Sequence, residues 1–150
     1  MAMTDADRVF VDTNVLVYAT VTTAPAHTAA RQALADRRAS GTELWISRQV
    51  LREYVAVLTR PQSFTRPASM TDVAADVRSF ERQFRVADDT APVTEQLLQL
   101  LEEVPKGGKQ VHDVNIVATM LVHGVTTLLT GNASDFARFE PRITVEPLVQ

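Results

Sequence analysis

The sequence contains no cysteine. This absence excludes disulfide bonds, zinc sites built from thiolates and cysteine nucleophiles. It also fits the reducing cytoplasm, which is the location that we expect. No apolar run approaches the length of a membrane span, and residues 1–8 lack the apolar core of a secretory signal.

Several catalytic motifs are also missing. The chain has no Walker A loop, no glycine-rich dinucleotide-binding loop and no nucleophile elbow around a serine. Its three histidines, His27, His112 and His123, lack the spacing of a zinc site. We expect His112 to end a helix rather than to bind a metal. The sequence therefore gives no support for a phosphate-binding loop, for a serine hydrolase with a nucleophile elbow, or for a zinc site built from histidines.

The residues that are present suffice for one folded domain. The chain has 150 residues, of which 45% are hydrophobic and 22% are charged, so we expect a single domain over residues 1–150. The net charge of −3 by itself disfavours nucleic-acid binding through bulk charge. Divalent cations bound to a cluster of acids would reverse the sign of the charge locally.

Strand-like apolar segments alternate with helix-like segments along the chain. We expect strands at 8–11, 44–46, 84–87, 125–130 and 143–145. We expect helices at 25–38, 48–58, 71–84, 90–104 and 113–123, with Ser47 and Thr71 as caps and Gly124 after the last helix. The alternation predicts an α/β fold with a mostly parallel central sheet flanked by helices on both faces. Ligands of such sheets bind beyond the carboxyl ends of the strands.

Polar side chains follow two of the expected strands. Asp12 follows the first strand, and Asn132 and Asp135 follow the strand that ends at Thr130. We expect these groups at the same edge of the sheet, where Asp12 could bind a metal or act as a nucleophile. The ordinary alternatives are a helix cap for Asp12, and a Gly-Asn turn followed by a capping Asp135.

Two further acids lie within expected helices. Glu53 borders the apolar arc of its helix, where a solvated charge is the ordinary interpretation. Asp113 stands at the top of an apolar stripe, and a buried carboxylate needs a cation, hydrogen bonds or a proton unless it simply caps the helix. Carboxylates without cysteine or clustered histidine suit Mg²⁺ or Mn²⁺.

The order of these acids resembles the PIN-domain family over Val9 to about Pro147. Four segments carry the resemblance: residues 11–16, Glu53 within 52–54, residues 111–118 and residues 130–136. The small size and the His112–Asp113 pair resemble the VapC group, the toxins of VapBC toxin–antitoxin pairs.

The resemblance implies a PIN fold and a metal-dependent endoribonuclease that cleaves structured RNA such as tRNA or rRNA. It implies a homodimer, inhibited by a VapB-type antitoxin whose C-terminal segment occupies the active-site groove. It also implies one or two Mg²⁺ or Mn²⁺ ions bound by the catalytic acids Asp12, Glu53, Asp113 and Asp135. The matching supporting positions are Thr13, Asn14, Thr130 and Asn132.

This hypothesis has a simple chemical form. Divalent ions would acidify a water molecule and neutralise phosphate oxygens, with Asp12 and Asp113 as the main ligands. Glu53 would bind metal or orient the attacking water, and Asp135 would complete a second site. Lys106 and Lys109 could contact RNA phosphates, or could simply belong to a solvated loop.

Three alternatives compete with this hypothesis, and two of them lack a residue that they need. A haloacid-dehalogenase-like phosphatase needs a second Asp two residues after Asp12, where Asn14 stands. A receiver domain needs a lysine after a late strand, and residues 127–150 contain none. A PIN fold that only binds a partner, without catalysis, is the alternative from another class of function.

Overall fold

A computed structural model of the chain describes residues 7–62, 64–104 and 110–149. Five strands form one sheet in the order β3-β2-β1-β4-β5, and every neighbouring pair is parallel. The strands are β1 (Arg8–Val11), β2 (Glu43–Ser47), β3 (Arg85–Ala87), β4 (Thr127–Thr130) and β5 (Thr144–Pro147). The predicted parallel sheet is therefore confirmed.

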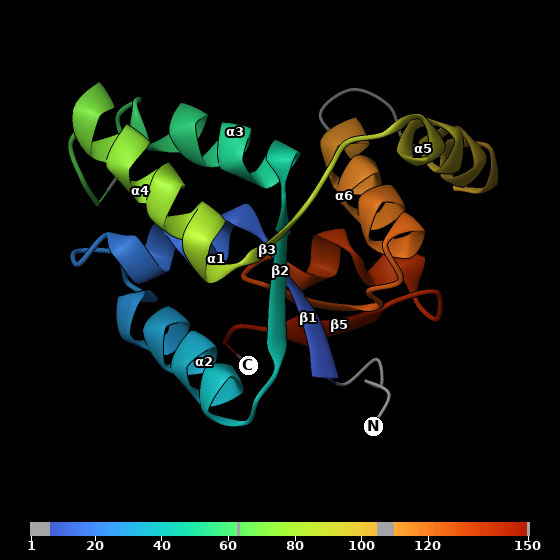
Figure 1. The fold of residues 1–150 in the computed structure, drawn as a ribbon, viewed down its shortest axis with the longest axis horizontal. Helices are drawn as coiled ribbons and strands as arrows, with labels where there is room; N and C mark the ends of the chain where they lie inside the picture. Colours follow the sequence, from blue (N-terminus) through green and yellow to red (C-terminus); the bar gives the residue numbers. More distant parts are fainter. Residues whose placement is uncertain (1–6, 63, 105–109, 150) are drawn as a thin grey trace.

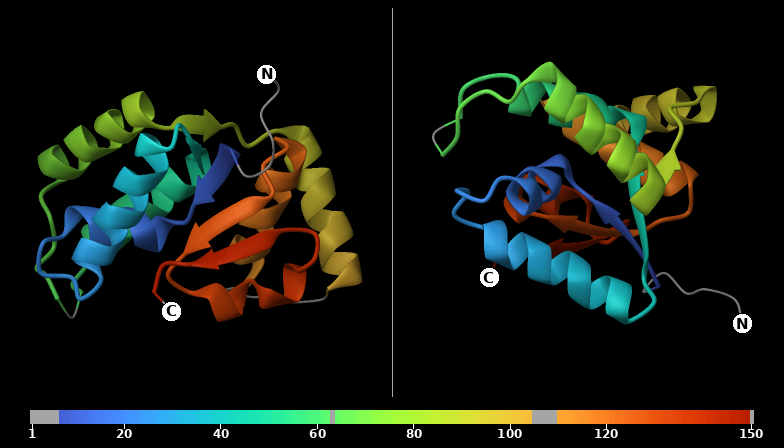
Figure 2. Two further views of the ribbon diagram at one scale, coloured as in Figure 1. Left: turned by 90° about the horizontal axis from the view of Figure 1, so that it is seen from below. Right: turned by 60° about the vertical axis from the view of Figure 1, so that its left-hand side comes forward.

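Helices cover both faces of this sheet, as predicted (Figure 1). The α-helices are α1 (Thr13–Thr20), α2 (His27–Ala39), α3 (Arg48–Leu58), α4 (Met70–Gln83), α5 (Ala91–Glu103) and α6 (Val111–Val122). Helices α1 to α4 lie on one side of the sheet, and α5 and α6 lie on the other (Figures 1 and 2). Two short 3-10 helices, η3 (Ala133–Asp135) and η4 (Ala137–Phe139), follow β4.

The strand order determines where a site can form. From β1 the chain moves outward to β2 and β3, and it then crosses back to β4 on the other side of β1. Parallel sheets of this kind bind ligands where neighbouring strands lead away in opposite directions, at their carboxyl ends. Here that point lies between the ends of β1 and β4, where Val11 pairs with Leu129.

The apolar residues of the strands and of α6 build the core. Phe10, Ile46 and Leu128, each at most 1% exposed, form the centre of the sheet. Helix α6 is buried on several sides, because Val114, Ile116, Val117, Ala118 and Met120 are all at most 1% exposed. Burying one large side chain of this kind stabilises a protein by roughly 1.5–3 kcal/mol. Within the described residues, no helix is long and apolar enough to span a membrane.

Several helix ends agree with the predictions. The Ser47 hydroxyl accepts a hydrogen bond from the backbone N–H of Val50 at 3.2 Å, as a cap should. Gly124, with φ of +71°, follows α6 in the left-handed conformation that glycine adopts easily.

Three predicted helix starts were wrong. Helix α2 begins at His27 rather than at Pro25. Ser69, not Thr71, caps α4, because the Ser69 hydroxyl accepts a hydrogen bond from the backbone N–H of Asp72 at 3.1 Å. Helix α6 begins at Val111, so His112 does not end a helix and Asp113 lies in its first turn rather than at its cap.

Candidate active site

Asp12 occupies the end of β1 and is only 6% exposed. Its carboxylate caps α1 by accepting a hydrogen bond from the backbone N–H of Thr13 at 2.8 Å. It also accepts hydrogen bonds from the Thr130 hydroxyl at 2.7 Å and the Asn14 amide at 3.3 Å. The helix cap that the sequence offered as the ordinary alternative for Asp12 is therefore present, and Thr13, Asn14 and Thr130 all donate to its carboxylate.

The end of β4 is tied to the same residues. The Asn14 side-chain oxygen accepts from the backbone N–H of Gly131 at 2.9 Å, and the Thr130 hydroxyl accepts from the backbone N–H of Asn132 at 3.0 Å. A Cβ atom at Gly131 would lie 3.2 Å from the Tyr18 ring and 3.3 Å from Asn14. A larger residue at this position would therefore force the Tyr18 or Asn14 side chain to move by a few tenths of an ångström.

Glu53 reaches the site from the middle of α3 and is half-buried. One carboxylate oxygen accepts a hydrogen bond from the Thr13 hydroxyl at 2.9 Å. The other accepts from the Gln49 side-chain amide, also at 2.9 Å. Neutral donors therefore orient both oxygens. Thr13 contacts both carboxylates, because its backbone N–H donates to Asp12 and its hydroxyl donates to Glu53.

Asp113 is half-buried in the first turn of α6. Among the described residues, no group donates a hydrogen bond to its carboxylate, in contrast to Asp12 and Glu53. Burial raises its pKa, and the negative charges of Asp135 and Glu53 raise it further, while Arg138 and His112 act in the opposite direction. Like charges therefore surround this carboxylate, and none of the residues that the structure describes forms an ion pair with it.

The buried Asp12 carboxyl is perturbed in the same direction. Burial raises its pKa to about 6, although the hydrogen bonds from Thr130 and Thr13 oppose this shift. The charges of Asp113 and Glu53 add to the increase. A charged Asp12 is therefore costly in the metal-free site, which is typical of carboxylates at functional positions.

These acids share one cleft of about 530 Å³. Of the predicted residues, its lining includes Asp12, Thr13, Asn14, Glu53, Asp113 and Asn132. Tyr18, Arg60 and Phe64 also line it, and the rings of Tyr18 and Phe64 meet edge to face with centroids 6.2 Å apart. Beside this cleft, Tyr18, Phe64 and Gly131 also line a smaller pocket with Leu148 and Val149.

Some predicted residues are not gathered in the cleft. Asp135 is exposed in η3 and lies outside the cleft lining, although its charge acts on Asp113. Lys106 and Lys109 fall outside the described residues. In the ranges 7–62, 64–104 and 110–149, no three His, Asp or Glu side chains are already arranged to hold a metal ion.

Several residues at this site were not predicted from the sequence. Gln49 and Asn115 hydrogen-bond to each other at 2.8 Å, and Gln49 also binds Glu53. The signal for Gln49 was its position four residues before Glu53, which places both side chains on one helix face. No local pattern indicated Tyr18, Arg60 or Phe64, because tertiary packing brings them to the cleft.

Comparison with known proteins identifies the family. The PIN domain model matches residues 9–140. Ribonuclease VapC24 of Mycobacterium tuberculosis is 29% identical over 130 residues, which cover 86% of this chain and 89% of that protein. The chain therefore belongs to the PIN-domain family, as its sequence resemblance indicated.

Solved structures share the fold. A toxin–antitoxin complex from Klebsiella pneumoniae superposes with a TM-score of 0.66 at 21% identity, covering 95% of this chain and 98% of that chain. VapC20 of Mycobacterium tuberculosis, described as a sarcin-ricin loop cleaving toxin, superposes with a TM-score of 0.62 at 20% identity, covering 80% and 86%. At these identities, the likeness establishes the fold alone.

Proposed function

We propose that this protein is a metal-dependent endoribonuclease that cleaves structured RNA and acts as the toxin of a toxin–antitoxin pair. The observation that carries the proposal is the position of Asp12, Glu53 and Asp113 in one cleft of a PIN-family chain. The name of the similar VapC24 ribonuclease, and the RNA-cleaving description of VapC20, support the same activity.

The donor groups of the site fit a divalent cation. Oxygen ligands without cysteine are those that Mg²⁺ and Mn²⁺ prefer. Asp12 has a pKa raised to about 6, and the pKa of Asp113 is raised by burial and by Asp135 and Glu53, so added positive charge would relieve both groups. Asp113 and Asp135 have carboxylates free of hydrogen bonds to described residues, so their side chains can turn toward an ion.

Each acid has a distinct task in this proposal. Bound Mg²⁺ or Mn²⁺ would acidify a water molecule and neutralise phosphate oxygens. Asp12 and Asp113 would hold the ion, Asp135 would complete the site, and Glu53 would bind the ion or orient the attacking water through a hydrogen bond. Thr130 and Thr13 fix the directions of the Asp12 and Glu53 carboxylates.

The remainder of the cleft suits a nucleic acid. The half-buried rings of Tyr18 and Phe64 provide aromatic surface beside the acids, and the exposed Arg60 provides a positive charge. Aromatic rings stack on bases and guanidinium groups bind phosphates, which supports RNA as the substrate despite the net charge of −3.

Two partners belong to the proposal. A VapB-type antitoxin is supported by the shared fold with the Klebsiella pneumoniae toxin–antitoxin complex. A homodimer follows from the VapC resemblance, and sedimentation of the purified chain would test it: a single species with the mass of one chain would contradict it.

The test of the activity uses protein stripped of any copurified partner. We expect discrete fragments from total RNA with Mg²⁺ or Mn²⁺, and none with a chelator. The Asp113→Asn variant should cleave at a rate lower by on the order of 100-fold or more, since it removes a charge that would hold the ion. Cleavage that survives both controls would contradict the site assignment.

A partner-binding module without catalysis makes a different prediction. Such a protein would give no fragments from any RNA pool and no heat in a calorimetric titration with Mn²⁺. Wild-type protein that binds Mn²⁺ without cleaving total RNA would direct the search to narrow RNA specificity, and individual tRNAs and rRNA fragments would be the next substrates.

A further inference from the structure

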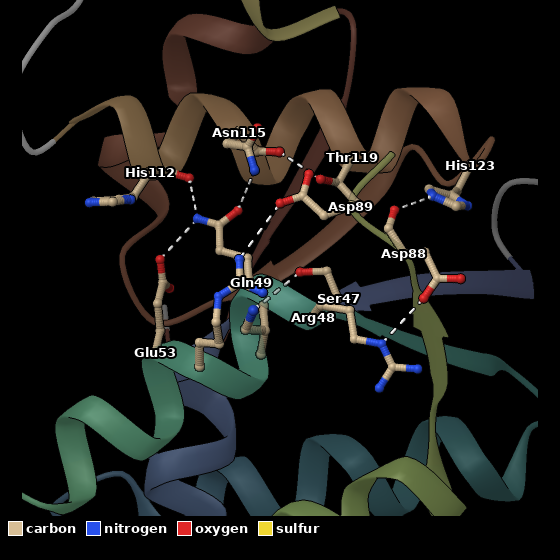
Figure 3. Close-up of polar contacts among 12 residues, drawn as sticks. Ser47, Arg48, Gln49, Glu53, Asp88, Asp89, His112, Asn115, Thr119 and His123 are labelled. Carbon is tan, nitrogen blue, oxygen red and sulfur yellow. Dashed lines mark hydrogen bonds and ion pairs between the residues drawn. The ribbon is translucent and has the colours of Figure 1, made fainter. Parts of the chain in front are cut away.

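Gln49 is a buried amide at the second position of α3, only 6% exposed. Its Nε2 atom donates to a Glu53 carboxylate oxygen at 2.9 Å and to the backbone carbonyl of His112 at 2.8 Å. Its oxygen accepts from the Asn115 amide at 2.8 Å. Figure 3 shows Gln49 reaching from α3 to α6. One side chain therefore joins Glu53 to the helix turn that carries Asp113.

These three hydrogen bonds occupy both N–H donors and the oxygen acceptor of the Gln49 amide. Both N–H groups of Gln49 have acceptors, and its oxygen has a donor, so the orientation of the amide is fixed. A glutamate at this position would lose both donors and would add a negative charge beside Glu53. A methionine would keep the length of the side chain and lose every hydrogen bond.

Gln49 provides hydrogen bonds between α3 and α6. Helix α3 packs mainly on α1 and α4, and α6 packs mainly on α5. The buried Gln49 amide spans the junction between α3 and α6 through the His112 carbonyl and the Asn115 amide. These polar contacts therefore contribute to the position of the Glu53 carboxylate relative to the first turn of α6.

We infer that Gln49 is a positioning residue for the reaction, and that Asn115 braces it. Gln49 fixes the direction of the Glu53 carboxylate together with Thr13, and it sets the position of that carboxylate relative to Asp113 through the His112 carbonyl. This inference rests on the proposed function, because its effect is exerted on two of the proposed catalytic acids. Polar groups behind metal ligands commonly change metal affinity or activity when they are removed.

The first experiment compares Gln49→Met with wild-type protein and with Gln99→Met. Gln99 is a matched control, because it is exposed on α5 and bonds Glu95 at the same spacing of four residues. We expect Gln49→Met to lower kcat and Mn²⁺ affinity by about 10–100-fold, with KM for RNA almost unchanged. Asn115→Leu should change both in the same direction by a smaller factor, and Gln99→Met should change neither.

The second experiment is a double-mutant cycle on Mn²⁺ affinity, measured by calorimetry with Glu53→Gln. If Gln49 acts through Glu53, Gln49→Met causes almost no further loss of affinity in the Glu53→Gln background. An equal loss in both backgrounds would mean a general structural role and would overturn the inference.

The outcomes separate this inference from the proposed function. Wild-type kcat and Mn²⁺ affinity in Gln49→Met would overturn the role of Gln49, while cleavage by the wild-type protein would leave the ribonuclease proposal standing. A wild-type protein that neither binds Mn²⁺ nor cleaves RNA would overturn both together.

Discussion

The two halves of the acidic site differ in how their carboxylates are held. Asp12 accepts hydrogen bonds from Thr13, Asn14 and Thr130, and Glu53 accepts them from Thr13 and Gln49. The carboxylates of Asp113 and Asp135 accept none from the described residues, and the charge of Asp135 raises the pKa of Asp113. The fold therefore fixes the carboxylates of Asp12 and Glu53, which form the held half of the site. Asp113 and Asp135 form the unheld half, whose like charges a bound cation would neutralise.

The largest expected effect is a dependence of the free energy of unfolding on pH, and it arises from Asp12 in the held half. Burial raises the folded-state pKa of Asp12 from 3.8 to about 6. The protonated carboxyl is therefore favoured in the folded protein, and its contribution to stability is lost as the pH rises through about 6. In a chelator, this group lowers the free energy of unfolding by at most about 3 kcal/mol between pH 4 and pH 7.

Urea denaturation at several pH values measures this loss. Asp12→Asn should show a flatter profile, because it has no carboxyl to ionise. Added Mn²⁺ should stabilise the wild-type protein at pH 7 and have little effect near pH 4.5, because metal binding needs the deprotonated ligands. A wild-type profile that matches Asp12→Asn throughout would contradict the assigned cost of the buried charge.

An intermediate effect is expected when the held half loses one donor. Thr130→Val removes the buried hydroxyl that donates to Asp12 at 2.7 Å and accepts from the Asn132 N–H. Leaving these buried groups unpaired should cost about 1–3 kcal/mol. The matched control is Thr127→Val, on the same strand and 7% exposed, whose hydroxyl has no hydrogen bond to a described residue. Equal urea midpoints for the two variants would count against a special role for Thr130.

The smallest expected effect comes from adding charge beside the unheld half. Asn132 is exposed and lines the cleft near the end of β4. Asn132→Asp should bind Mn²⁺ several-fold more tightly, because affinity for a divalent ion rises with the number of carboxylate ligands. Gln99→Glu adds the same charge on exposed α5 and controls for net charge. Equal gains in both variants would show a general electrostatic effect rather than a ligand effect.

The parts of the site that follow from strand ends were easier to predict from the sequence than the parts that lie on helices. Asp12 and Thr130 end two apolar strands, so their meeting at one sheet edge followed from the parallel fold. The cap at Ser47 was also predictable, because it immediately precedes an apolar-periodic helix. By contrast, the start of α4 was ambiguous, because Ser69 and Thr71 are both suitable caps, and in the structure Ser69 accepts from the backbone N–H of Asp72.

The contacts around Glu53 and Asp113 were harder to predict. Gln110 precedes α6 without a capping side-chain bond, so no local signal marked the start of that helix two residues before Asp113. Asn115 meets Gln49 across 66 positions of sequence. Tyr18 and Phe64 share the cleft, and the Thr23 hydroxyl, in the segment that follows α1, donates to the Phe64 carbonyl. Each contact depends on tertiary structure rather than on periodicity.

The pairing of β4 with the end of the chain has a practical consequence. The backbone N–H of Leu148 binds the Thr130 carbonyl at 2.8 Å, so Leu148 and Val149 lie beside Tyr18 and Gly131. A purification tag fused after Val149 would therefore begin next to the cleft and could shield it from a large RNA. Arg8 begins β1 at the amino end of the strand, opposite the carboxyl ends where the acids lie, so an N-terminal tag is the better choice for RNA cleavage assays.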